Sequence, residues 1–174
     1  MNILKSIPAL NKDGNLNVII EIQKGSKNKY ELDKETGLIK LDRVMHTGQD
    51  YPFDYGFVPN THWHDGDPLD VVLYTTYALQ PGILVEARAV AVMDMVDNGE
   101  SDAKIIAVPV EDPRLKEIIS LETAPKHFIK EVQHFMETYK MIQNKVVEIK
   151  GVYDEKRAQE VIKESIELYE SKNK

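Results

Sequence analysis

The densest group of acidic residues lies in a short loop near the middle of the sequence. The carboxylates of Asp65, Asp67 and Asp70 fall within six residues that also contain a glycine and a proline, which excludes a regular helix. Two carboxylates about 4 Å apart repel by ~4 kcal/mol at an effective dielectric constant of ~20, so gathering three requires a compensating charge. Oxygen ligands alone favour a hard cation such as Mg²⁺ over zinc. The segment is either a metal-binding loop or an acidic surface turn.

A second acidic segment contains Asp97 and Asp102, followed by Lys104. Acids at hairpin tips are common, so this segment alone is equally consistent with a solvated turn. If residues 102–104 enter a strand, Asp102 and Lys104 lie on the same face because side chains alternate. Two acidic loops could supply two or more ions, the arrangement used for in-line displacement at phosphorus.

Lysine, arginine and tyrosine side chains could supply the complementary contacts to phosphate oxygens. Arginine offers a planar fork, lysine a point charge and tyrosine a phenolic donor. The candidates are Lys29, Arg43, Tyr51, Tyr55, Lys104, Tyr139 and Lys140. Taken alone, each of these residue types is more often a surface or structural residue than a phosphate contact, and Tyr139 has the helical spacing of a core residue.

Length and composition limit the classes of protein that the chain could belong to. Its 174 residues suit a single domain spanning 1–174. A net charge of −7 disfavours nucleic acid as a partner. No apolar run is long enough to span a bilayer, the N-terminus lacks the pattern of a secretory signal, and cysteine is absent. We therefore expect a cytoplasmic protein without a membrane partner.

The elements that must position these side chains are mainly strands, followed by two helices. Alternation, β-branched runs and turn residues predict strands at 18–22, 29–33, 38–42, 71–74, 83–96 and 104–110. Lys29 and Glu31 then share one face, with Tyr30 and Leu32 toward the core, and Asn98-Gly99 predicts a tight hairpin.

The last third of the chain changes to helical periodicity. Phe128, Val132 and Phe135 recur at helical spacing, and Asp154 is placed to cap a second helix. The segment Tyr51–Phe57 is an aromatic loop that could serve as a packing plug. Many short strands followed by two helices indicate a small β-barrel with helices packed against it.

The ordered set of motifs resembles the soluble family I inorganic pyrophosphatases of the prokaryotic type over nearly the whole chain. The hexapeptide from Asp65 to Asp70 is the most specific of these motifs. The others are Glu21-Ile22, Gly25-Ser26, Lys29-Tyr30-Glu31-Leu32-Asp33-Lys34, Asp42-Arg43, Tyr51-Pro52, Tyr55-Gly56-Phe57-Val58-Pro59, Asp97, Asp102-Ala103-Lys104 and Tyr139-Lys140.

The resemblance implies a fold, an activity and a site. The fold is α+β and mainly β, a five-stranded OB-like barrel with two C-terminal helices packed outside and the site at the barrel mouth. The activity is hydrolysis of pyrophosphate to two phosphates with three to four Mg²⁺, with Mn²⁺ as a substitute, by a homohexamer. The implied metal ligands are Asp65, Asp70, Asp97, Asp102 and Glu31.

The same resemblance implies roles for the remaining site residues. Asp67 would be the general base for a water molecule held by the metal ions. Glu21 and Tyr51 would support the site from behind. Phosphate oxygens would be held by Lys29, Arg43, Tyr55, Lys104, Tyr139 and Lys140.

Four residues depart from the pattern or stand outside it. Gln23 replaces a usual proline, and Asp54 replaces a usual neutral residue and is expected to face solvent. His62 and His64 precede the acidic loop, and a surface position is expected for His64 over transition-metal ligation.

Two other functional classes compete with this interpretation. An oligonucleotide-binding barrel requires a basic, aromatic strand face, whereas here Lys29 alternates with Glu31 and Lys104 with Asp102. A Ca²⁺-binding regulatory module leaves the lysines, arginine and tyrosines unexplained.

Overall fold

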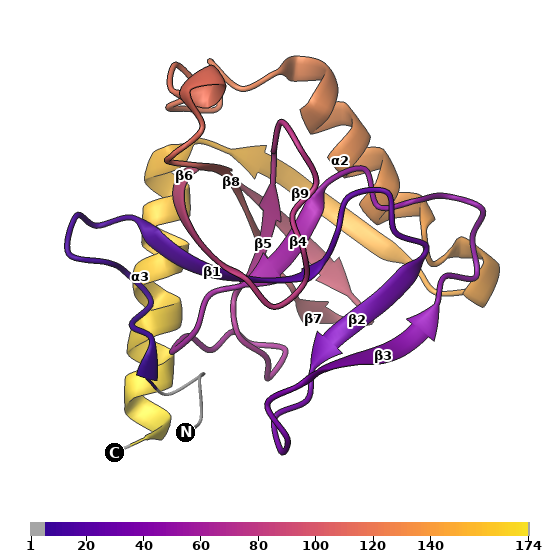
Figure 1. Ribbon diagram of the computed structural model, residues 1–174. Coiled ribbons are helices and arrows are strands. Elements are labelled where there is room, and N and C mark those ends of the chain that lie inside the picture. Colours follow the sequence, from indigo (N-terminus) through magenta and orange to yellow (C-terminus); the bar gives the residue numbers. More distant parts are fainter. Residues whose placement is uncertain (1–5, 174) are drawn as a thin grey trace.

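A closed ring of five strands forms the centre of the protein in the computed structural model, which describes residues 6–173 (Figure 1). The strands are, in order around the ring, β1 (Leu16–Ile22), β4 (Asp54–Phe57), β5 (Asp70–Leu73), β8 (Lys104–Pro109) and β6 (Leu84–Asp97). Pairing of β1 with β6 closes the ring, and β5–β8 is its one parallel pair within the described residues. This closed, uneven sheet confirms the predicted OB-like barrel.

The remaining elements extend the barrel and cover it. Strands β7 (Glu100–Ser101) and β9 (Val147–Tyr153) both pair with the distal half of β6. Strands β2 (Asn28–Leu32) and β3 (Ile39–Val44) form a separate two-stranded sheet that stands beside the barrel (Figure 1). The helices are η1 (Pro113–Leu115), α2 (Lys126–Thr138), η2 (Met141–Gln143) and α3 (Glu155–Lys172).

Both predicted helices are present, and each buries the face that the sequence indicated. In α3, Asp154 caps the first turn by accepting the Arg157 N–H at 3.1 Å. Its buried residues include Val161 and Ile162, and the helix packs on β6. In α2, Phe135 is buried against Phe53 with ring centroids 5.4 Å apart.

The aromatic segment before and within β4 is part of the core. Tyr51 and Phe53 are buried among aromatic side chains of α2, and residues 54–57 form β4 itself. Gly56 is required there, because a Cβ at this position would lie 2.0 Å from the backbone oxygen of Ile19. This close approach of β1 and β4 is available to glycine alone.

Asp54 corrects one expectation from the sequence. Its side chain does not face solvent: Asp54 is 0% exposed. Its carboxylate accepts hydrogen bonds from Lys24 N at 2.7 Å, Leu79 N at 3.1 Å and Thr75 Oγ1 at 2.5 Å. Three donors replace the lost water, which makes burial of the carboxylate tolerable. Asp54 thus joins the end of β1 to the loop that precedes β6.

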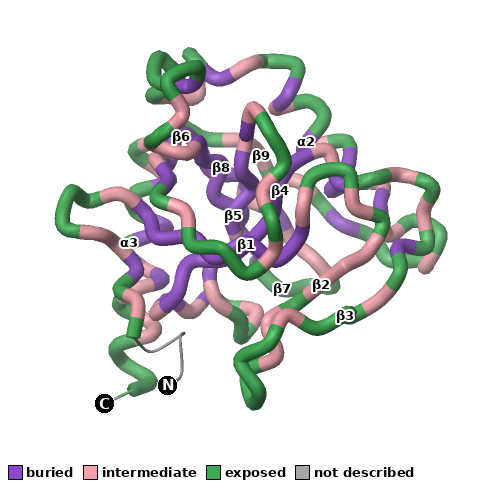
Figure 2. Tube along the Cα trace, viewed as in Figure 1, coloured by how far each residue is buried: buried purple, intermediate pink, exposed green. Residues whose placement is uncertain are grey.

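Burial is concentrated inside the barrel and beneath the two helices, while β2 and β3 stay largely accessible (Figure 2). Tyr30 is only partly buried, although it packs against the core as expected. Strands β4, β7 and β9 have no counterpart among the predicted strands, and β4 corrects the expectation that the whole of Tyr51–Phe57 is a loop. Among residues 6–173, no helix combines the length and apolarity needed to cross a membrane.

Candidate active site

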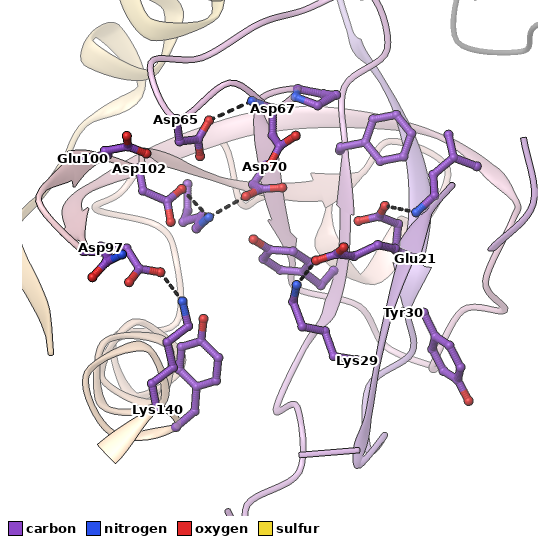
Figure 3. A pocket seen from close by; sticks show the side chains of 18 of the residues that line it. Glu21, Lys29, Tyr30, Asp65, Asp67, Asp70, Asp97, Glu100, Asp102 and Lys140 are labelled. Atoms are coloured by element: carbon purple, nitrogen blue, oxygen red, sulfur yellow. Dashed lines mark hydrogen bonds and ion pairs between the residues drawn. The ribbon is translucent and has the colours of Figure 1, made fainter. Parts of the chain in front are cut away.

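A pocket of about 360 Å³ opens between one end of the barrel and the β2–β3 hairpin (Figure 3). Its wall combines carboxylates with lysines and tyrosines drawn from segments far apart in the sequence. The predicted site residues that line it are Glu21, Lys29, Glu31, Tyr55, Asp65, Asp67, Asp70, Asp97, Asp102, Lys104, Tyr139 and Lys140.

The parallel pairing of β5 with β8 builds the centre of this pocket. Asp70 and Lys104 are the first residues of these strands and stand opposite each other in the register. Lys104 Nζ donates to Asp70 Oδ2 at 2.5 Å and also to Asp102 Oδ1. The expectation that Asp102 and Lys104 share a face is therefore confirmed, and the Lys104 side chain is only 5% exposed.

Asp65, Asp70 and Asp102 form the group best suited to hold a metal ion. Each offers one carboxylate oxygen, and these oxygens lie within 4.8 Å of one another. The donor set is oxygen only, which fits a hard divalent cation such as Mg²⁺. Figure 3 shows the three carboxylates turned toward the same part of the pocket.

Burial sets the electrostatics of this group. Burial raises the pKa of Asp65 to about 6, and the negative charges of Asp102 and Asp70 add to this shift. The hydrogen bond from the Asp67 backbone N–H favours the ionised carboxylate and opposes the shift. Burial likewise raises the pKa of Asp70, although Lys104 favours the ionised form. Burial alone lowers the pKa of Lys104, but Asp70 and Asp102 outweigh it and raise the pKa overall. A divalent cation would favour the ionised form of these carboxylates, as the Lys104 ammonium group does for Asp70.

Asp67 lies beside the metal-competent group and has a different environment. Its backbone N–H donates to Asp65 Oδ1 at 3.0 Å, and Gly66, at φ +91°, makes the turn between them. Its carboxylate is exposed and pairs with Lys34 at 2.6 Å. Asp67 is outside the group of Asp65, Asp70 and Asp102 whose oxygens lie within 4.8 Å.

The opposite wall comes from the end of β6 and the segment after α2. Asp97, the last residue of β6, accepts a hydrogen bond from Lys140 Nζ, and the two side chains are 16% and 14% exposed. The ring of Tyr139 stacks on Phe135 with centroids 5.0 Å apart and lies beneath the Lys140 ammonium. Tyr139 is thus a core residue that also reaches the pocket.

The third wall is strand β2 with the end of β1. Lys29 Nζ bonds to Glu31 and lies 3.5 Å from Asp42 on β3. Glu21 is buried and accepts the Leu32 N–H at 2.7 Å. Burial raises the pKa of Glu21 to about 8, with smaller contributions from the charges of Asp70 and Glu31.

Tyrosine and arginine side chains occupy two different depths. Tyr55 lines the pocket, with Lys104 Nζ 5.7 Å from its ring centroid, and burial raises the pKa of its phenol. Tyr51 lies behind the lining, where its ring contacts Tyr55 at a centroid distance of 6.0 Å. Arg43 does not line the pocket either: it pairs with Lys29 in the β2–β3 register and bonds to Asp42 at 2.6 Å.

The sequence reasoning missed several residues of the pocket lining. Lys34, Asn98, Glu100 and Lys145 line the pocket together with the predicted residues. Asn98 and Gly99 make the predicted tight turn, at φ +55° and +87°. Proximity of Lys34 to Asp67 depends on how the β2–β3 hairpin folds over the barrel, for which local spacing offers no signal.

The two histidines near the acidic loop contact helix α3. His64 Nε2 lies 2.8 Å from Glu164 Oε1, and His62 Nε2 bonds to Lys172. His64 is exposed, and the metal-competent group found within residues 6–173 contains no histidine.

The fold and the pocket together define a β-barrel protein whose site places a cluster of carboxylates that could hold a metal ion beside several lysines. The sequence model of the family described as inorganic pyrophosphatase matches residues 18–170. The chain therefore belongs to the inorganic pyrophosphatase family and is a hydrolase.

Individual relatives agree with this assignment. An inorganic pyrophosphatase of Geobacillus stearothermophilus is 48% identical over 150 residues, which are 86% of this chain and 91% of that protein. Soluble inorganic pyrophosphatase 5 of Arabidopsis thaliana is 47% identical over 88% of this chain and 71% of its own length. The crystal structure of an inorganic pyrophosphatase from Thermus thermophilus has a TM-score of 0.92 and 44% identity, covering 98% and 99% of the two chains.

Proposed function

We propose that this chain hydrolyses pyrophosphate to two phosphates with the help of several Mg²⁺ ions. The observation that carries the proposal is the composition of one pocket, in which three clustered carboxylates lie next to several lysines, of which Lys104 is buried. Carboxylates alone would repel a polyanion, and lysines alone would not activate water. The combination fits a substrate that arrives with divalent cations.

Asp65, Asp70 and Asp102 are the proposed ligands of the first metal ions, since their oxygens already lie within 4.8 Å. Asp97 and Glu31 line the same pocket and would hold further ions, up to three or four in all. When bound, Mg²⁺ or its substitute Mn²⁺ lowers the pKa of water and neutralises phosphate charge.

Asp67 is the proposed general base. Its carboxylate is accessible, flanks Asp65 without belonging to the clustered group, and can accept a proton from a water molecule. The hydrogen bond from its own backbone to Asp65 fixes its place in the loop.

The cations and phenols of the pocket are the proposed contacts for phosphate oxygens. Lys29, Lys104 and Lys140 reach the pocket from three walls, and Tyr55 and Tyr139 add phenolic groups. Arg43 would join them by turning from Asp42, to which it now bonds. Their positive charges would neutralise the charge that develops on the departing phosphate.

A phosphate-release assay tests the proposal. We expect Mg²⁺-dependent release of phosphate from pyrophosphate, abolished by EDTA and restored by excess Mg²⁺. Asp67→Asn should lower kcat by roughly 10²-fold or more, the usual contribution of a positioned base, while the circular dichroism spectrum is unchanged. Asp13→Asn, at an exposed turn outside the pocket, is the matched control. No hydrolysis with Mg²⁺ would overturn the function, and an active Asp67→Asn would overturn the role of Asp67.

We further propose a cytoplasmic homohexamer. Exposed apolar side chains on β3 and around η2 support a contact between subunits: Leu41, Val44, Met141, Ile142 and Val146. Light scattering coupled to size-exclusion chromatography measures the mass directly, and a monomer at micromolar concentration would contradict the hexamer.

A further inference from the structure

Four lysines of the pocket bond to the carboxylates that the proposed function assigns to metal binding and catalysis. The pairs are Lys104 with Asp70 and Asp102, Lys140 with Asp97, Lys29 with Glu31, and Lys34 with Asp67. The same lysines, except Lys34, are the proposed contacts for phosphate oxygens. Lys29, Lys104 and Lys140 therefore each have two competing partners, a carboxylate of the protein and an oxygen of the substrate.

A carboxylate oxygen that accepts a hydrogen bond from an ammonium group has limited room for a metal ion. Mg²⁺ binds oxygen at about 2.0–2.1 Å, and a charged N–H···O bond spans about 2.7–2.9 Å. Two positive groups so close to one oxygen repel each other strongly in a partly buried site. The metal ion and the lysine therefore exclude each other at that oxygen.

We propose that the pocket lysines and the divalent cation compete for the same carboxylate oxygens, so that metal binding releases lysines toward the phosphate. The inference rests on the proposed function, because that function supplies the metal and the anion. Metal and phosphate then bind cooperatively, in addition to any effect of direct contact between them. Each ligand must increase the affinity for the other by the same factor.

Burial decides which lysines matter most. The pair of Lys140 and Asp97 is 14% and 16% exposed, and Lys104 is 5% exposed. Such pairs are poorly screened by solvent and salt. Lys34 and Asp67 are 60% and 63% exposed, so their pair is weak. Competition should therefore be strongest at Lys104 and Lys140.

Lys140 is the better position for a test. Lys104 is enclosed between two carboxylates, and its removal would leave both without a cation in a buried site. Lys140 stands at the pocket wall against a single carboxylate. Lys145 is the matched control, because it lines the same pocket and no ion pair of its ammonium group is found within residues 6–173.

The experiment is calorimetric titration of Mn²⁺ into protein freed of metal with EDTA and dialysed, with and without inorganic phosphate. Without phosphate, Lys140→Met should bind Mn²⁺ about five- to tenfold more tightly than the original protein, a gain of ~1–1.4 kcal/mol. Lys145→Met should stay within about twofold of the original protein. Phosphate should tighten Mn²⁺ binding less in Lys140→Met than in the original protein.

Three results would overturn the inference. If Lys140→Met and Lys145→Met bound Mn²⁺ more tightly by the same factor, the effect would come from the overall loss of positive charge in the pocket. Unchanged or weaker Mn²⁺ binding by Lys140→Met would exclude competition, as would an undiminished effect of phosphate. Lys29→Met, which frees Glu31, replaces Lys140→Met if that variant has lost its native circular dichroism spectrum, and the same criteria apply. Hydrolysis of pyrophosphate by the original protein is measured separately, so loss of the proposed function is distinguishable.

Discussion

Glu21 provides a quantitative test of the electrostatics of the pocket. It is buried behind β2, and its Oε1 accepts the Leu32 N–H at 2.7 Å. Burial raises its pKa from 4.5 to about 8, and the charges of Asp70 and Glu31 add to the shift. The unfolded chain ionises Glu21 near its ordinary pKa, whereas the folded protein keeps the proton until about pH 8.

The sign of the effect follows from proton linkage. Below pH 4.5 both states hold the proton, and Glu21 has no effect on stability through its charge. Between the two pKa values folding requires uptake of a proton, so stability falls by about 1.4 kcal/mol per pH unit. At pH 7 the resulting penalty is on the order of 3 kcal/mol.

The substitution Glu21→Gln removes this penalty and keeps an oxygen for the Leu32 N–H. Its buried amide donor adds a cost of about 1–3 kcal/mol that does not depend on pH. We therefore expect the free energy of unfolding of Glu21→Gln, minus that of the original protein, to rise steadily from pH 5 to pH 8. Urea unfolding of the metal-free protein in EDTA, at fixed protein concentration, measures this difference. A difference that is flat or falls with pH would refute the reasoning.

Three further predictions concern the fold and the proposed metal site. Gly56→Ala places a Cβ 2.0 Å from the Ile19 oxygen, so urea unfolding should show a loss of more than about 3 kcal/mol, and a mild change would contradict that contact. Asp54→Ala leaves three hydrogen-bond donors without an acceptor and should lower the free energy of unfolding by about 3 kcal/mol or more. Asp54→Asn should be less severe in the same assay. Mg²⁺ at about 100 times its Kd should stabilise the protein by ~2.7 kcal/mol in thermal unfolding. That gain should shrink in Asp70→Asn, and an equal gain would remove Asp70 from the ligands.

Local patterns predicted the elements whose signals are local. The helical spacing of Phe128, Val132 and Phe135 and the capping position of Asp154 located both helices. Asn98-Gly99 located the tight turn at the end of β6, because few residue pairs accept two positive φ angles. The acidic loops could be recognised because clustered carboxylates need a compensating charge wherever they meet.

Asp54 and Lys34 show where local patterns fail. Asp54 is compatible with burial only because donors from Lys24, Thr75 and Leu79 converge on it, and these come from two distant segments. Lys34 reaches Asp67 only because the β2–β3 hairpin folds over the barrel end. Strand β9 was missed although Val147-Glu148-Ile149-Lys150 alternates apolar and polar residues; Gly151 interrupts this alternation, and pairing with β6 holds the whole strand in place.

The parallel pairing of β5 and β8 explains why the centre of the site could not be predicted from strand signals alone. Adjacent hairpin strands would bring the end of one strand to the start of the next, whereas a parallel pair brings two starts together. Asp70 and Lys104 are such starts, 34 residues apart in sequence and joined at 2.5 Å. Backbone hydrogen bonds of a closed barrel hold both residues, so their side chains are positioned more firmly than the loop residue Asp67. Substitutions that loosen the barrel near this pair should therefore weaken metal binding before they unfold the protein.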